Sequence, residues 1–208
     1  LNPNSMNYKK AFTALAFVLF IFKNGNGQAN VETLLYNTTN NTYNGALTDV
    51  VSVSYDNTYL YIESSGIPSY FVNYAGVSVF QPANQNFTFR IKRSPKQETN
   101  TNTSGFFGAI GVGINGSPFF NLRDGKSWDD STNSFSFAGS DIWHSVAYEF
   151  EGLDMDGSYG HSTASNVYHH HVADIELFDE NDAANHSPIV GWAFDGYPIY
   201  GSYGYLDP

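Results

Sequence analysis

Short runs of β-branched and aromatic residues, each followed by a turn signal, recur along the chain and constrain its fold more than any other feature. They occupy residues 50–55, 58–63, 87–93, 167–178, 189–194 and 197–200. Asp56-Asn57 and Asp195-Gly196 each join two such runs and are typical of tight hairpin turns. No segment shows the long 3.6-residue apolar period of an amphipathic helix. The pattern predicts a mainly β fold, an antiparallel sandwich or irregular barrel with short helical segments at most.

Three further segments add to this pattern. Residues 70–80 have the composition of a strand, and residues 106–114 and 119–120 are expected to form strands around a turn at 115–118. Residues 141–150 alternate as a strand does, but the same segment also suits a short helix. Both interpretations of that last segment stay open.

The composition narrows the class of protein. The 208 residues are enough for one domain with a substantial core. Without Cys, the chain has no disulfide framework, no thiolate metal site and no iron–sulfur ligation. Nine Lys and Arg against 20 Asp and Glu give a net charge of −11. A phosphate backbone is repelled by such a chain, which excludes nucleic acid as a partner.

The first 29 residues have the pattern of an export signal. Lys9-Lys10 precede an unbroken apolar run over residues 11–22, which is shorter than the ~20 residues needed to span a bilayer. Small residues follow, and cleavage is expected after Ala29. We expect a signal peptide with a few upstream residues over 1–29, and one mature β-rich domain over 30–208. That domain has no expected membrane span and is secreted, periplasmic or on the cell surface. An uncleaved anchor or a buried helix is the alternative.

Charge and histidine are unevenly distributed along the chain. Residues 127–208 contain 14 Asp and Glu, no Lys or Arg, and all six His. Acidic side chains without basic partners repel one another unless positive charge arrives from outside the chain. Imidazole and carboxylate groups are a common ligand set for divalent metal ions. A bound cation is one explanation of this composition, and a solvated acidic surface is the other.

The segment Tyr168-His169-His170-His171 places two imidazoles at alternate positions. Successive side chains of a strand point to opposite faces, so His169 and His171 share the face of the apolar residues that follow. Their Cα atoms would lie about 6.5–7 Å apart, which lets both rings bind one ion. His170 falls on the other face with the carboxylates and is expected to face solvent. A hydrogen-bonded network through Tyr and Asp is the structural alternative for the inward-facing pair.

Two more histidines extend this candidate site. His161 lies eight residues before His169 and is the best third ligand, and His186 is a candidate that would join from a loop. His144 is assigned to the core instead. With no thiol in the chain, zinc or copper is the expected ion. The predicted metal ligands are His161, His169, His171 and His186.

Several segments together resemble a known family. They are Gly160-His161, Tyr168-His169-His170-His171 and the block His186-Ser187-Pro188-Ile189-Val190-Gly191-Trp192-Ala193-Phe194-Asp195-Gly196-Tyr197-Pro198-Ile199-Tyr200-Gly201. This set resembles the YHYH-domain family of secreted proteins, and Asn115-Gly116 with Phe119-Phe120 is similar to an upstream element of that family. The resemblance covers about residues 109–208. It implies a secreted domain, but the family name describes a motif and implies no reaction.

Two departures from the family pattern bear on the site. His170 stands where the family name implies Tyr, on the face opposite His169 and His171, so the exchange should leave a site built by that pair intact. Members of the family continue past the Tyr200-Gly201 block into a further His-containing stretch. The resemblance therefore implies that the domain is incomplete after Pro208.

These observations support two hypotheses from different classes. The first is an exported acidic domain whose His cluster binds zinc or copper. If that metal is catalytic, Asp154, Asp174 and Glu176 are candidate bases, but no residue is assigned to catalysis and enzyme activity stays open. The second is a cell-surface recognition or adhesion module with internal His and Tyr scaffolding. Its partner would be a glycan or another cell-surface component, contacted by exposed aromatics such as Tyr197, Tyr200, Tyr203 and Tyr205.

Overall fold

The structure is a computed structural model that describes residues 31–70, 80–97, 99, 107–151 and 155–205. Over these residues the chain forms fourteen short strands, one α-helix and two 3₁₀-helices. The mainly β prediction is confirmed, and the described strands form four sheets that close no barrel. Within the same ranges, no helix has the length and apolar character needed to cross a membrane.

The first of two large sheets is antiparallel. It consists, in spatial order, of β3 (Val50–Tyr55), β4 (Tyr59–Ser64) and β5 (Phe87–Lys92). The expected alternation is clearest in β4, where Leu60 and Ile62 are buried and the tyrosines beside them are only half-buried. The predicted hairpin at Asp56 is confirmed by the antiparallel pairing of β3 with β4.

The second large sheet has six strands in the order β11-β12-β7-β6-β13-β14. Their bounds are β6 (Ala109–Gly113), β7 (Pro118–Phe120), β11 (Gly160–Ser162), β12 (Tyr168–His170), β13 (Ile189–Ala193) and β14 (Pro198–Tyr200). β12 runs parallel to β7, and the other neighbouring pairs are antiparallel. The predicted hairpin around Asp195-Gly196 is therefore confirmed as β13–β14.

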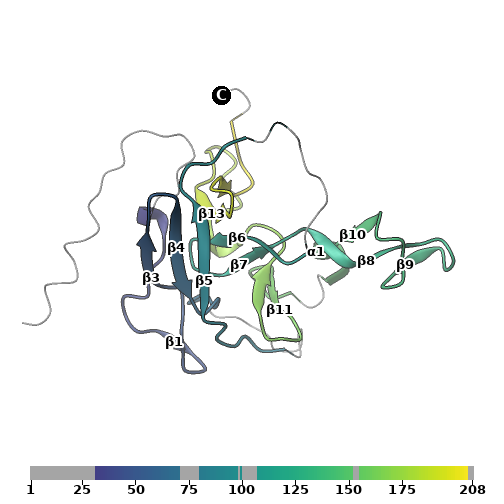
Figure 1. Cartoon of the computed structure of the whole chain (residues 1–208), viewed down its shortest axis with the longest axis horizontal. Helices are drawn as coiled ribbons and strands as arrows, with labels where there is room; N and C mark the ends of the chain where they lie inside the picture. The colour runs from purple at the N-terminus through teal and green to yellow at the C-terminus, as the bar shows by residue number, and fades with distance from the viewer. Residues whose placement is uncertain (1–30, 71–79, 98, 100–106, 152–154, 206–208) are drawn as a thin grey trace, which may run out of the picture.

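The hydrophobic core joins these two sheets. Its buried side chains come from the strands of both sheets and from the residues that directly follow η1 (Val31–Thr33) and β6, and they are Leu34, Val50, Leu60, Ile62, Phe89, Ile91, Val112, Ile114 and Trp192. Figure 1 shows β3, β4 and β5 on one side of the body and β6, β7 and β13 next to them. The apolar alternate positions of the strands thus cover one another, which removes their surface from water.

A third sheet projects from the body as an arm (Figure 1). β8 (Arg123–Asp129) lies between β10 (His144–Val146) and β9 (Ser134–Ser136), and α1 (Ala147–Glu151) follows β10 directly. The segment 141–150 therefore contains both structures that its sequence allowed, first strand and then helix. The remaining small elements are η1 (Val31–Thr33), η3 (Ile175–Leu177) and the β1 (Thr42–Tyr43)–β2 (Ala46–Leu47) hairpin.

The predicted strand over residues 167–178 is wrong beyond its first part. β12 ends at His170, and the chain then turns into η3. Asp174 caps η3, because its Oδ1 accepts the backbone N–H of Glu176 at 3.0 Å. An Asp side chain that accepts the backbone N–H two residues later favours a turn over the hydrogen bonds of a strand pair. Here the turn forms and the strand ends. The predicted strand at 70–80 lies, apart from its two ends, outside the described residues.

Candidate metal centre

Three histidines come together on one side of β11 and β12. His161 is the direct cross-strand partner of His169, and such partners project their side chains to the same face. His171 follows His169 by two positions and points the same way. The prediction that His169 and His171 share a side is confirmed, because their Nε2 atoms lie 3.0 Å apart. The Nε2 of His161 also lies 3.0 Å from that of His169.

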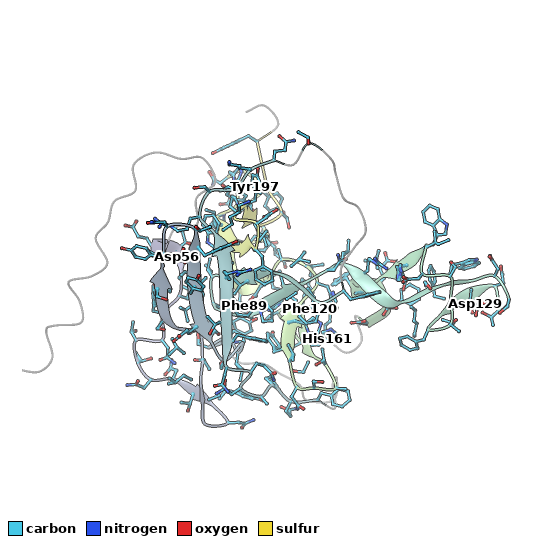
Figure 2. The ribbon with its side chains drawn as sticks, in the orientation of Figure 1. Asp56, Phe89, Phe120, Asp129, His161 and Tyr197 are labelled. Atoms are coloured by element: carbon cyan, nitrogen blue, oxygen red, sulfur yellow. The ribbon has the colours of Figure 1, made fainter. Side chains whose placement is uncertain are left out.

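A glutamate from another element completes the group. Glu151 is the last residue of α1, and its Oε2 lies 3.1 Å from Nε2 of His161 and 3.4 Å from Nε2 of His171. One ligand atom from each of Glu151, His161, His169 and His171 lies within 4.8 Å of all the others. We refer to these four residues as the His–Glu cluster. Figure 2 places His161 in the middle of the molecule, away from Asp129 at the far end of the arm.

Backbone carbonyls orient two of the rings. Nδ1 of His169 lies 3.2 Å from the carbonyl oxygen of Val167, and Nδ1 of His171 lies 2.7 Å from that of Asn121. A carbonyl oxygen only accepts hydrogen bonds, so each Nδ1 carries the hydrogen and donates it. The lone pair of each neutral ring is then on Nε2 and points into the cluster, as it does in a metal ligand.

These lone pairs face each other with no hydrogen between them. Since both Nδ1 atoms carry the ring hydrogen, the 3.0 Å contact between Nε2 of His169 and Nε2 of His171 is not a hydrogen bond between neutral rings. Burial, and then the neighbouring imidazoles, lower the pKa of His169 to about 2, so this ring stays neutral at pH 7. Converging lone pairs of this kind could be neutralised by a cation bound between them.

The four groups lie close enough together to share one ion. Metal–nitrogen bonds of about 2.0–2.1 Å at tetrahedral angles separate neighbouring ligand atoms by about 3.3 Å. Four of the six separations within the His–Glu cluster measure 3.0, 3.0, 3.1 and 3.4 Å, and all six lie within 4.8 Å. Three imidazole nitrogens and one carboxylate oxygen are ligands that zinc and copper accept. The residues present therefore fit a divalent transition metal.

Glu151 supplies the negative charge of the cluster. Burial alone raises the pKa of its carboxyl group, but the neighbouring imidazoles of His161 and His171 outweigh that effect and hold the pKa well below its usual range. Its side chain is 29% exposed, against 10% for His161 and 6% for His171. The cluster is thus closed on the histidine side and opens toward solvent beside the carboxylate.

The end of β7 supports the cluster from behind. The ring of Phe120 stacks on His169 with centroids 4.0 Å apart and planes at 27°, and it meets His171 edge-on at 6.1 Å. The next residue, Asn121, supplies the carbonyl that holds His171. Two neighbouring residues of one strand end therefore fix two rings, which restricts the rotamers available to the predicted ligands.

His170 lies on the opposite face of β12, and the expectation that it faces solvent is wrong. Its side chain is 0% exposed, and its Nε2 lies 3.0 Å from Oη of Tyr70 and 3.4 Å from Oδ2 of Asp174. Burial lowers its pKa to about 4, so the ring is neutral at pH 7. The carboxylates on this face are inside the protein, which is why His170 is buried with them.

His170 belongs to a buried polar network, whose members are Tyr70, Asn115, Asp156, Tyr168, His170 and Asp174. Tyr70 donates to Oδ2 of Asp174 at 2.8 Å, and its Oη lies 3.0 Å from that of Tyr168. Tyr168 donates to Asp156 at 2.9 Å, and the Asn115 amide donates to Asp174 at 3.0 Å. A Tyr and Asp network of the kind expected for inward-facing histidines therefore exists, but it holds His170 on the other face.

Gly160 shows how closely this network is packed. A Cβ atom at this position would lie 2.1 Å from Oη of Tyr168 and 2.9 Å from Cε1 of His170. Contacts under 3.0 Å are too close for any side chain. The two residues of the Gly160-His161 pair therefore have separate roles. Gly160 leaves space for the buried polar network, and His161 contributes an imidazole to the His–Glu cluster.

The fourth predicted ligand, His186, lies apart from the His–Glu cluster. Among the described residues the group suited to a metal does not include it. Its Nδ1 lies 2.7 Å from the carbonyl oxygen of Ser187, and its ring packs against Tyr200 and Tyr205 at centroid distances of 4.9 and 5.2 Å. His186 precedes β13, which is separated from β11 by three strands of the sheet, and sheet order cannot be deduced from the spacing of histidines.

The remaining sequence candidates take other places. His144 lies in the arm, where its Nδ1 is 3.1 Å from the carbonyl oxygen of Asp124 and its Nε2 is 2.9 Å from Oδ1 of Asp141. Of the candidate bases, Asp174 is part of the buried polar network, Glu176 is exposed in η3, and Asp154 lies outside the described residues. None of the described candidates reaches the cluster.

Glu151 is the member of the His–Glu cluster that the sequence interpretation missed. It ends a segment whose secondary structure was ambiguous, and an isolated acidic residue carries no local signal of ligation. Its position depends on where the arm returns to the body, since α1 directly follows β10. Only the path of the chain could identify it.

Comparison with known proteins agrees with the motifs. A family model described as YHYH protein matches residues 88–208, which is more than half of the chain and includes the three clustered histidines. No curated protein and no solved structure matches the chain.

Proposed function

The chain belongs to the YHYH protein family, and on this premise we propose that its His–Glu cluster binds one divalent transition metal ion, zinc or copper. The ligands are Nε2 of His161, His169 and His171 and a carboxylate oxygen of Glu151. One observation carries the proposal. The Nε2 atoms of His169 and His171 lie 3.0 Å apart, and the Nδ1 hydrogen of each ring is donated to a backbone carbonyl outside the cluster. Family membership implies no reaction, so the function is argued from this geometry.

The proposed ion has a structural role. Four protein ligands fill the positions of a four-coordinate ion, whereas catalytic sites usually keep one position for water or substrate. Three ligands come from β11, β12 and the residue after β12, and Glu151 comes from the end of α1 at the base of the arm. An ion bound by both parts stabilises the folded state by its binding free energy, because the unfolded chain has no such site.

We also propose that the protein is exported. The basic residues, the apolar run at 11–22 and the small residues up to Ala29 support this. A ligand set of His and Glu keeps its affinity in oxidising compartments, where cysteine ligands would form disulfides. N-terminal sequencing of protein recovered outside the cytoplasm should begin at Asn30. Recovery of uncleaved chain in the cytoplasm alone would contradict export.

Elemental analysis of the purified protein tests metal binding. After reconstitution with zinc or copper and desalting, we expect close to one equivalent of metal per chain. The double variant His169→Ala/His171→Ala should fall to background, whereas His186→Ala, a matched control outside the cluster, should keep the metal. Background metal in the reconstituted wild type, or full retention by the double variant, would refute the proposal.

The rival hypothesis, a recognition module with internal His and Tyr scaffolding, gives a different result. It predicts that the wild type holds no metal and that its melting temperature does not change with chelator. The buried polar network supplies that kind of scaffolding on the other face of β12. The two hypotheses therefore separate on metal content.

A further inference from the structure

A groove lies at one end of the β3–β4–β5 sheet, apart from the His–Glu cluster. It consists of two adjoining hollows of about 490 Å³ and about 340 Å³, whose walls share Gly45, Ala46 and Asn84. Figure 1 shows β1, whose hairpin forms one rim, at the lower end of that sheet and away from the arm. Volumes of this size are typical of small-molecule sites, at about 300–1,000 Å³.

The walls of the groove are held in place before any ligand binds. β4 and β5 pair in unbroken register through Glu63↔Thr88 and Ser64↔Phe87 along one wall. On the rim, Oη of Tyr43 donates to the side-chain oxygen of Gln81 at 2.8 Å. A preformed site avoids much of the ordering entropy that otherwise opposes binding.

Several amide and hydroxyl groups in the groove have unused hydrogen-bonding capacity. The side-chain oxygen of Asn84 accepts the backbone N–H of Asn86 at 2.9 Å, which leaves the Asn84 amide hydrogens available. Within the described part of the chain, the Asn86 amide and the Thr88 hydroxyl have no hydrogen-bond partner. Amides and hydroxyls both donate and accept, as sugar hydroxyls do.

Apolar surface lies beside these groups. Leu47 and Val51 are exposed on the walls, and Phe87, paired with Phe89 at a centroid distance of 4.7 Å, lines the same hollow. Polar groups next to exposed apolar surface suit a ligand that presents both hydroxyl edges and C–H faces.

The charge of the groove excludes other ligand classes. Its lining contains no Lys or Arg, so phosphate, sulfate and carboxylate ligands find no cationic partner. It contains one carboxylate, Glu63, which already accepts a hydrogen bond from Ser52 at 2.5 Å. A divalent cation needs several oxygen ligands and is excluded as well.

We propose that this groove binds a neutral oligosaccharide. The site is independent of the metal proposal, because most of its lining precedes residue 88, where the family match begins, and its lining contains no residue of the His–Glu cluster. The protein would then combine a metal-stabilised domain with a separate carbohydrate-binding surface.

Calorimetric titration with soluble neutral hexasaccharides tests the proposal. The probes are the hexaoses of cellulose, chitin, laminarin, β-mannan and starch. The protein is produced in a host without N-glycosylation, since Asn86-Phe87-Thr88 is a glycan acceptor sequence. We expect at least one probe to bind and its affinity to fall at least tenfold in Asn86→Gly/Thr88→Val. Gly tolerates the positive φ of 49° at Asn86, and Val keeps the shape of Thr.

The matched control is Asn133→Gly, which makes the same exchange at an exposed Asn with φ 51° in the arm. It should leave the affinity unchanged, and so should chelator. The proposal is overturned if no probe binds at millimolar concentration, if the double variant binds as the wild type does, or if chelator abolishes binding. Metal analysis of the same samples reports separately on the His–Glu cluster.

Discussion

Both faces of β12 carry histidine, but the groups that surround the imidazole rings differ between the two faces. On one face, His169 and the following His171 point their Nε2 atoms at His161 and Glu151. On the other, His170 meets hydroxyl and carboxylate groups of Tyr70 and Asp174. On the first face the Nε2 atoms of His169 and His171 face each other, whereas on the second Nε2 of His170 lies beside a hydroxyl group and a carboxylate.

This difference teaches that burial alone does not identify a histidine ligand. All three rings of the motif are largely buried, and His170 is the most buried of them. What separates the rings is the group that each Nε2 atom meets. Nε2 of His170 lies beside a hydroxyl and a carboxylate, whereas Nε2 of His169 lies beside other imidazole nitrogens, which is the arrangement that a cation could occupy.

The largest effect is expected from Gly160→Ala. The new methyl group would overlap Oη of Tyr168 and force the buried polar network apart, so the free energy of unfolding should fall by more than about 4 kcal/mol. Urea unfolding followed by circular dichroism measures this. Gly157→Ala is the matched control, because a Cβ there meets no atom within 4 Å. Equal stability of the two variants would show that the network is looser than described.

Asp174→Ala should lower the free energy of unfolding by about 3–5 kcal/mol, because it removes the acceptor for Tyr70 and Asn115 in a buried place. The fraction that remains folded should still bind one equivalent of metal, since the His–Glu cluster lies on the other face. Glu176→Ala, an exposed exchange in the same short helix, should be nearly neutral. Loss of metal from folded Asp174→Ala would show that the two faces are coupled.

Removing the metal should destabilise the protein by about 3–4 kcal/mol when the free ion is at 100–1,000 times its dissociation constant. Thermal unfolding with and without chelator at pH 7 measures the effect. The variant His169→Ala/His171→Ala should show no response to chelator. A response of equal size in that variant would place the ion elsewhere.

The two faces should respond to pH with opposite sign. Burial raises the pKa of Asp174 to about 6 in the folded protein, against 3.8 for the unfolded group, although its hydrogen bonds oppose this. Its favourable contribution is therefore complete below pH 3.8 and is lost as pH rises through about 6. The metal-bound face behaves in reverse, because protons displace the ion from imidazole as pH falls.

The contribution of Asp174 titration is isolated by comparing the free energy of unfolding of the wild type with that of Asp174→Asn, both without metal. From pH 7 to pH 4 the wild type should gain about 2 kcal/mol of stability relative to the variant. Urea unfolding at several pH values gives this difference. A difference that does not change with pH would mean that Asp174 titrates normally.

The smallest effect is expected from Phe120→Leu. This exchange keeps an apolar side chain but removes the stack on His169, which is worth about 0.5–1.5 kcal/mol. Zinc affinity, measured by competition with a chelating dye, should fall by up to about tenfold because the His169 ring is less firmly oriented, and the free energy of unfolding of the metal-free protein should fall by no more than about 1.5 kcal/mol. Phe135→Leu in the arm is the control, and an equal loss of affinity there would contradict a local role.

Much of the fold and part of the site could be predicted from local patterns. The hairpins at Asp56 and Asp195 followed from turn residues between strand-like runs, and the shared side of His169 and His171 followed from the two-residue period of a strand. These features depend on residues that are neighbours in the sequence, which is why they could be predicted from it. The end of β12 at His170 was missed because the local bond from Asp174 to Glu176 overrides that period.

By itself, the sequence determined the β class, the family and the paired direction of His169 and His171, because each depends on backbone periodicity or on a contiguous motif. Only the tertiary structure decided that Glu151 joins the histidines, that His186 does not, and that His170 is buried. The physical reason is that these outcomes depend on the order of strands in a sheet and on the return of the arm to the body. Burial and hydrogen bonding between segments distant in sequence determine the strand order and the path of the arm. No local sequence pattern encodes either of them.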